Sequence, residues 1–282
     1  MDAEPDADLV ARLRAAGCVF AEDEAALLEG AVLERFGDGA LARSPEAAVE
    51  LERLVARRVA GDPLEQLLGW AEFGGIRVLL EPGVFVPRRR TELLAETAAG
   101  FASAVASAGQ PAVVVDLCCG AGAIGAVIAD AAGPVDLVAA DLDPAAVRAA
   151  RRNLEPRGAR VVEGDLYAPL PRDLRGRVDV LAVNAPYVPT DEIAMMPPEA
   201  RDHEALIALD GGGDGLDVHR RVAASALDWL APGGRLLIET SRRQAAATRA
   251  LVESAGLTAE VRHDDERGGT VVVGLRGPSP AA

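Results

Sequence analysis

The chain has 282 residues, more than one typical domain needs, so a catalytic domain with a smaller companion is expected. Acidic residues outnumber basic ones by 44 to 29, the formal charge is −15 and no lysine is present, which disfavours nucleic acid as the main partner. No apolar run is long enough to span a bilayer and the acidic start does not resemble a secretory signal, so we expect a cytoplasmic protein without a membrane partner.

Helices are expected first, because three segments between residue 7 and about residue 70 space apolar residues three or four apart. The third has Ser44 as its expected N-cap and Pro45 at its first helical position. These segments predict a helical domain over residues 1–72. Two short β-prone runs around the turn signal EPG then predict a β-hairpin linker over residues 73–90.

Residues 91–282 are predicted to form one domain in which apolar strands alternate with helices. This order is typical of an α/β fold with a mostly parallel sheet that helices cover on both faces. The last two β-runs, TAEVRHD and TVVVGLRG, are separated only by DERGG, so they are expected to pair as an antiparallel hairpin. The predicted architecture is therefore a Rossmann-like sheet that ends in a hairpin.

A glycine-rich loop follows the first strand of this domain. In VVVDLCCGAGAIG, Gly120, Gly122 and Gly125 have the G-x-G-x-x-G spacing that lets a ligand approach the backbone at a helix start. Asp141 ends the next strand, where a carboxylate can accept hydrogen bonds from two ribose hydroxyls. A dinucleotide and S-adenosyl-L-methionine (AdoMet) both fit this pair, and a turn without a ligand is the simpler alternative. Asp116, four residues before the glycines, and the C-terminal hairpin favour AdoMet.

Asp165 and Leu166 follow the next strand, in the segment EGDLY. They would lie at the same edge of the sheet as the glycine loop, where they either border an adenine ring or form an ordinary turn.

The strand VDVLAV ends in NAPY, beside the expected ligand edge of the sheet. Asn184 Oδ1 and the Ala185 carbonyl are suitable acceptors for the N–H groups of a planar amide or aniline-like nitrogen. Fixed acceptors turn its lone pair toward a methyl group and stabilise the positive charge that develops on methylation. Pro186 would stiffen the loop and Tyr187 would supply a flat wall for the substrate. The alternative is an ordinary turn after a strand.

From Pro63 to Arg276 the chain resembles the HemK/PrmC family of protein glutamine-N5 methyltransferases. The segments that carry the resemblance are PLEQLLGWAEFGGIRVLLEPGVFVPRRRTELL, VVDLCCGAGAIG, AADLDPAAV, NAPYVP, APGGRLLIET and, as the most specific signal, EARDHEALIALDGGGDGLD. The resemblance implies a class I AdoMet-dependent methyltransferase fold, with S-adenosyl-L-homocysteine as the product and no metal. It also implies methylation of the glutamine in the Gly-Gly-Gln motif of peptide-chain release factors, a role in translation termination, and a helical domain that helps to recognise the protein substrate.

The site residues that the resemblance implies follow the same motifs. Cofactor contacts are expected at Asp116, Cys118, Cys119, Gly120, Ala121, Gly122, Asp141, Asp165, Leu166 and Asn184. Substrate binding and catalysis are expected at Asn184, Ala185, Pro186 and Tyr187.

Four departures from the family pattern leave the protein substrate open. NAPY replaces the usual NPPY, PRRRTE replaces PRPETE, Leu166 stands where an aromatic residue is common, and ETS replaces EIG at residues 239–241. The change to PRRRTE places Arg89 and Arg90 where a rigid turn and an acid are expected. Together with Arg88 they either hold a carboxylate of a ligand or form a solvated loop.

Two other functions also fit the motifs. An exocyclic adenine amine poses the same geometric problem as an amide, so N6-methylation of DNA or RNA is the alternative activity, although the acidic balance disfavours it. The same fold would also serve a protein that binds AdoMet without transferring its methyl group.

Overall fold

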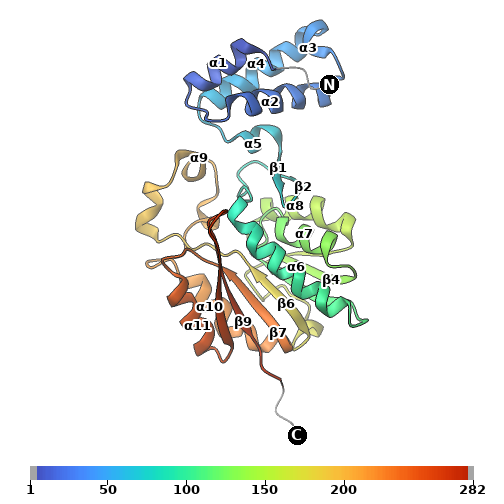
Figure 1. Ribbon diagram of the computed structural model, residues 1–282, viewed down its shortest axis with the longest axis vertical. Helices are drawn as coiled ribbons and strands as arrows, with labels where there is room; N and C mark the ends of the chain where they lie inside the picture. Colours follow the sequence, from blue (N-terminus) through green and yellow to red (C-terminus); the bar gives the residue numbers. More distant parts are fainter. Residues whose placement is uncertain (1–4, 279–282) are drawn as a thin grey trace. The chain divides into compact units, whose positions relative to one another are not determined.

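The computed structural model describes residues 5–278, which belong to two compact units (Figure 1). The first unit runs to Trp70 and includes Pro197–His203, and the second comprises Ala71–Met196 and the chain from Glu204 onward. Within residues 5–278, no helix combines the length and the apolar character needed to cross a membrane.

The first unit is helical, as its periodicity predicts. Its helices are α1 (Ala7–Ala15), α2 (Ala21–Phe36), α3 (Ala40–Arg43), α4 (Pro45–Val59), α5 (Leu64–Leu68) and α9 (Pro198–Arg201). The predicted start of α4 is confirmed, because Ser44 Oγ accepts a hydrogen bond from the Ala47 N–H at 3.2 Å. Leu13, Leu28 and Val55 are fully buried in the core of this unit.

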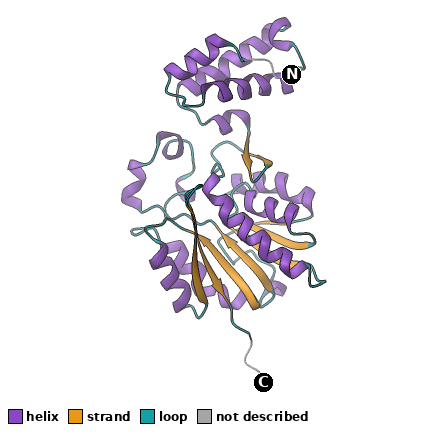
Figure 2. Cartoon of the chain, viewed as in Figure 1, coloured by secondary structure: helices purple, strands orange, loops and turns teal. Residues whose placement is uncertain are grey.

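The second unit contains a seven-stranded sheet with the order β5-β4-β3-β6-β7-β9-β8. Figure 2 draws the strands in orange and the helices around them in purple. Its strands are β3 (Ala112–Leu117), β4 (Val135–Asp141), β5 (Arg160–Glu163), β6 (Val178–Val183), β7 (Leu230–Glu239), β8 (Thr258–Asp264) and β9 (Gly269–Leu275). The strands from β5 to β7 are parallel, whereas β9 is antiparallel to β7 and to β8. The predicted fold class and the predicted C-terminal hairpin are therefore confirmed.

Helices cover both faces of this sheet (Figure 1). They are α6 (Glu92–Ala106), α7 (Ala123–Ala131) and α8 (Pro144–Leu154) on one face and α10 (Asp217–Trp229) and α11 (Ala245–Ser254) on the other. Successive residues of β3 alternate between the two faces, with Val114 in the core under α6–α8 and Val115 in the core under α10 and α11. Both cores consist mainly of Ala, Val and Leu, which matches the low aromatic content of the chain.

The predicted hairpin forms at a different turn. A two-stranded sheet joins β1 (Trp70–Phe73) to β2 (Ile76–Leu79), so its turn is Gly74–Gly75 and not EPG. EPG does turn the chain, because the Val84 N–H donates to the Glu81 carbonyl at 3.1 Å, but no strand follows it. Val84 and Val86 are instead buried in the core, so their apolar character reflects packing and not strand pairing.

Candidate active site

The predicted site residues follow neighbouring parallel strands. The register pairs Leu117, the last residue of β3, with Val183, the last residue of β6. Cys118 and Asn184 therefore leave adjacent strands at the same level of the sheet. On the other side of β6 runs β7, which ends at Glu239. The order of the strands reverses at β3, and ligands of open α/β sheets bind at such a position.

The glycine loop is shaped for close approach. Gly122 precedes α7 with a φ of 80°, and a Cβ atom at this position would lie 2.8 Å from Leu154 Cδ1. A side chain there would be strained and would also collide with α8. The turn before α7 therefore requires glycine at this position, which lets the loop pack closely against α8.

Backbone strain marks two of the predicted cofactor residues. Among residues 5–278, Cys118 and Leu166 are the only non-glycine residues with positive φ, at 55° and 48°. Cys118 directly follows β3, and Leu166 lies shortly after β5, so both lie where parallel strands end and a ligand is expected. Left-handed backbone costs about 1 kcal/mol or more for such residues, and it is found preferentially at functional sites.

Asp141 supports the glycine loop from the end of β4. Its Oδ2 accepts a hydrogen bond from the Gly120 N–H at 2.8 Å, and its Oδ1 accepts one from the Asp143 N–H at 2.9 Å. Burial raises the pKa of this carboxyl group, and the backbone donors oppose that rise. Each carboxylate oxygen has a second lone pair, so a ribose contact at Asp141 stays compatible with these bonds and remains a prediction.

Asp116 lies entirely inside the domain, beneath the glycine loop. It has no exposed surface, and its Oδ2 accepts a hydrogen bond from the Gly125 N–H at 2.9 Å. Burial raises its pKa to about 7, which the bond from Gly125 only partly offsets. Asp116 thus holds the first turn of α7 against β3, and the cofactor contact expected at this residue remains a prediction.

Replacing Asp116 with asparagine should change how stability depends on pH. The native carboxyl group keeps its proton up to about pH 7, but in the unfolded chain it ionises near pH ~4. Its contribution is complete below pH ~4 and is lost as pH rises toward about 7, because the unfolded state then binds fewer protons than the native state. The loss is at most on the order of 4 kcal/mol.

Urea denaturation of the free protein at pH 5 and pH 8 measures this effect. The wild type should lose more unfolding free energy between the two pH values than Asp116→Asn does. Asp191→Asn, which removes an exposed carboxylate, is the matched control and should keep the wild-type difference. Equal pH dependence in all three proteins would show that Asp116 is ionised throughout the range.

Asp165 and Leu166 lie at the same edge, after β5. Leu166 is buried, and Asp165 Oδ2 pairs with Arg221 Nη2 of α10 at 2.5 Å. The structure thus fixes Asp165 through an arginine that the sequence analysis did not single out. An adenine contact for the two residues remains a prediction.

The NAPY loop places one carboxamide without an internal partner beside the glycine loop. Asn184 is half-buried, and within residues 5–278 its side chain makes no hydrogen bond. Ala185 is buried, which fixes the backbone next to Asn184. The carboxamide is only half-buried and has no partner within residues 5–278, so its polar atoms are available to a ligand.

Tyr187 is held by groups from outside its loop. Its hydroxyl donates to Glu239 Oε1 at 3.2 Å, and its carbonyl accepts from Gln244 Nε2 at 2.9 Å. The side chain of Glu239 is almost entirely buried at the end of β7. In the sequence, Glu239 stands out only as part of the departure from EIG at residues 239–241, and no pattern singles out Gln244. An acidic residue at the end of an apolar strand was the one available signal.

The segment DGGGDG packs against the NAPY loop. The Gly211 N–H donates to the Val188 carbonyl at 2.8 Å, and the Thr190 N–H donates to the Gly212 carbonyl at 3.0 Å. A Cβ atom on Gly215 would lie 2.3 Å from the Tyr187 carbonyl oxygen. The glycines of this segment therefore allow backbone-to-backbone contact, which gives the most family-specific part of the sequence a structural role.

Known proteins match most of this chain. The model of the Methyltransferase small domain family matches residues 75–214. The release factor glutamine methyltransferase of Geobacter sulfurreducens is 35% identical over 235 residues, which are 83% of this chain and 80% of that protein.

The chain is also similar in sequence to an enzyme named for a different substrate, and in structure to a solved methyltransferase. The 4-amino-L-phenylalanine/4-methylamino-L-phenylalanine methyltransferase of Streptomyces pristinaespiralis is 38% identical over 203 residues, covering 72% of this chain and 69% of that protein. A solved methyltransferase structure from Pyrococcus furiosus has a TM-score of 0.53 and 15% identity, and it covers 82% of this chain and 98% of that one. This structural likeness supports the fold.

Proposed function

The chain belongs to the release factor glutamine methyltransferase family and is an AdoMet-dependent protein-glutamine methyltransferase. We propose that its substrate is a peptide-chain release factor, which it methylates on the glutamine of a Gly-Gly-Gln motif. The observation that carries the proposal is the Asn184 carboxamide, which has no hydrogen-bond partner within residues 5–278 and follows β6 next to the glycine loop. A substrate amide needs this kind of partner.

The residues present fit the cofactor. A Cβ atom at Gly120 would meet nothing within 4 Å, so open space lies next to the loop there, and the strained backbone of Cys118 and Leu166 borders the same edge. When bound, AdoMet supplies a methyl group made electrophilic by its sulfonium. The loop from Cys118 to Gly122 and Asp141 would hold it.

The NAPY residues would activate the substrate nitrogen by orientation. An amide nitrogen is a poor nucleophile because its lone pair is delocalised into the carbonyl. Asn184 Oδ1 and the Ala185 carbonyl would accept its two N–H bonds, so that the lone pair points at the methyl group. The same two oxygens stabilise the positive charge on the nitrogen as the new N–C bond forms. The substitution of alanine for proline in NAPY keeps the carbonyl oxygen on which this role depends.

The direct test combines the purified protein, methyl-labelled AdoMet and release factors, followed by mass spectrometry of the Gly-Gly-Gln peptide. We expect one methyl group on the glutamine nitrogen with the wild type and a large loss with Asn184→Ala. Total RNA and genomic DNA are assayed in parallel. Label confined to adenine in nucleic acid would overturn the proposal in favour of the alternative activity.

A second candidate substrate is an arylamine carried by an amino acid. It is favoured by the similarity to the Streptomyces pristinaespiralis enzyme, whose name gives 4-amino-L-phenylalanine as its substrate. An aniline nitrogen has the same planarity and the same delocalised lone pair, so the two acceptors of NAPY would serve it equally well. A parallel assay with 4-amino-L-phenylalanine separates the two, since the preferred substrate should have the much higher kcat/KM.

A further inference from the structure

Tyr187 is contacted by a charged pair that lies outside the NAPY loop. The Arg90 guanidinium lies over the Tyr187 ring, with its Cζ atom 6.0 Å from the ring centroid. Arg90 Nε is 3.4 Å from Glu239 Oε1, the same oxygen that accepts the Tyr187 hydroxyl at 3.2 Å. The ring and the hydroxyl of Tyr187 are thus held by one cation and one carboxylate.

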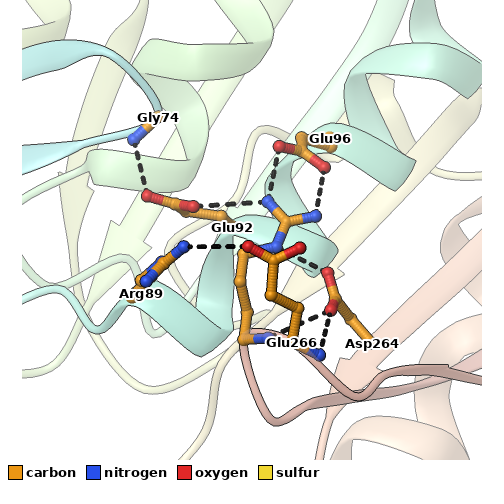
Figure 3. A network of polar contacts seen from close by, with 7 residues as sticks. Gly74, Arg89, Glu92, Glu96, Asp264 and Glu266 are labelled. Carbon is orange, nitrogen blue, oxygen red and sulfur yellow. Dashed lines mark hydrogen bonds and ion pairs between the residues drawn. The ribbon is translucent and has the colours of Figure 1, made fainter.

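The backbone that carries Arg90 is fixed on both sides. Arg90 belongs to the short 3-10 helix η1 (Arg89–Thr91). Before η1, Arg88 Nη2 pairs with the buried Glu204 at 2.5 Å. After it, Glu92 Oε1 accepts from the Gly74 N–H at 3.2 Å, as Figure 3 shows.

The β8–β9 turn strengthens this anchor. Arg267 lies in that turn and pairs with Glu92 at 3.3 Å, Glu96 at 2.6 Å and Asp264 at 2.6 Å. Figure 3 shows the carboxylates of this network converging at the start of α6. These contacts fix the backbone on both sides of Arg90, and its half-exposed side chain reaches the buried Glu239 from that fixed position.

We propose that Arg90 and Glu239 are positioning residues of the methyl transfer, which hold Tyr187 as the wall against which the substrate side chain lies. This role rests on the proposed function of the NAPY loop. It assigns a purpose to the arginine that stands where the related family has an acid.

The two charges also balance one another at the reaction centre. The side chain of Glu239 is 2% exposed and that of Arg90 is 44% exposed, so the pair neutralises a buried carboxylate with a cation that reaches the surface. Positive charge develops on the substrate nitrogen during transfer. Without Glu239, Arg90 would repel that charge. Without Arg90, the carboxylate would attract it, so the loss of Arg90 slows the reaction only through the lost contact with the Tyr187 ring. Loss of Glu239 should therefore slow the reaction more than loss of Arg90.

The proposal also predicts how the activity depends on pH, through the ionisation of Glu239. Burial raises the pKa of Glu239, and contacts with Thr91, Arg90 and Tyr187 oppose that rise. Other titratable groups near this cluster are His219 of α10, whose ring centroid lies 6.3 Å from that of Tyr187, and Glu204, whose pKa is raised by burial against the opposing charge of Arg90. Removing the Arg90 charge should raise the Glu239 pKa further. The acid limb of the kcat profile then moves to higher pH.

The test compares Glu239→Gln, Arg90→Gln and the control Arg89→Gln, an adjacent arginine that pairs with the exposed Glu266. On the acceptor that the wild type methylates, we expect kcat to fall at least tenfold for Glu239→Gln and about threefold for Arg90→Gln, with unchanged AdoMet affinity. The acid limb should shift upward only in Arg90→Gln. Arg89→Gln should match the wild type in all three measurements. Wild-type kcat and acid limb in Arg90→Gln would overturn the proposal.

A stability measurement, which needs no substrate, tests the proposal in two further cases. In the first, Glu239→Gln does not fold, and in the second, the wild type methylates neither candidate acceptor. Unfolding free energies of Arg90→Gln, Tyr187→Leu and the double variant form a mutant cycle, in which Tyr187→Leu removes the ring that Arg90 contacts. The two changes should be non-additive if Arg90 holds Tyr187, and strict additivity overturns the contact. An inactive wild type with a coupled cycle refutes the proposed function alone.

Discussion

Replacing Asn184 with alanine should lower kcat for methyl transfer by a factor on the order of 10² to 10³, because it removes one of the two acceptors that orient the substrate nitrogen. Its carboxamide makes no hydrogen bond within residues 5–278, so the change leaves no internal partner unsatisfied. The free energy of unfolding should therefore change little. Steady-state kinetics and urea denaturation of the same preparation separate these two effects.

Asn184→Asp is the informative companion variant. It keeps an acceptor oxygen at the same position but adds negative charge, so it should retain more activity than alanine. Wild-type kcat in Asn184→Ala would mean that the substrate nitrogen is held elsewhere. If Asn184→Ala instead bound both AdoMet and the substrate more weakly, the carboxamide would lie against the cofactor.

The positions of the site motifs could be predicted from sequence because parallel strands end at the same edge of a sheet. The glycine loop, Asp141 and NAPY lie at the ends of apolar strands. The glycine loop follows β3 and NAPY follows β6, and these two strands are neighbours in the sheet. Local patterns thus sufficed to predict which residues meet. They did not reveal that Asp116 is enclosed beneath the loop, because burial depends on how α7 and β3 pack.

The support of the site could not be predicted in the same way. Glu239 and Gln244 contact Tyr187 across more than fifty positions of the chain. Glu239 belongs to the segment APGGRLLIET, but nothing in that segment indicates a contact with Tyr187. The hairpin turn was misplaced for a related reason. EPG is the stronger turn signal, but the β1–β2 pair needed the Gly74–Gly75 turn, and the apolar residues after EPG were taken up by the core.

Gly215→Ala should impair both folding and activity, because the glycine allows backbone contact behind the catalytic loop. Its φ of 77° strains any other residue, and the added methyl group would lie 2.3 Å from the Tyr187 carbonyl oxygen and 2.5 Å from Gln244 Nε2. Backbone strain and overpacking together cost roughly 2–5 kcal/mol. Any folded protein should have a displaced Tyr187 and a kcat lowered about tenfold or more.

Gly213→Ala is the matched control, since it lies in the same segment. Nothing within 4 Å would meet its Cβ atom, and its φ lies outside the left-handed region. It should keep wild-type activity and a stability within about 1 kcal/mol of the wild type. Equal behaviour of the two variants would show that the segment from residue 211 to residue 215 does not press against NAPY. A loss of activity and stability in Gly215→Ala alone would identify that contact as the reason why glycine is needed at residue 215. Packing of the glycine segment against the NAPY backbone would then hold both acceptor oxygens in place without using a side chain.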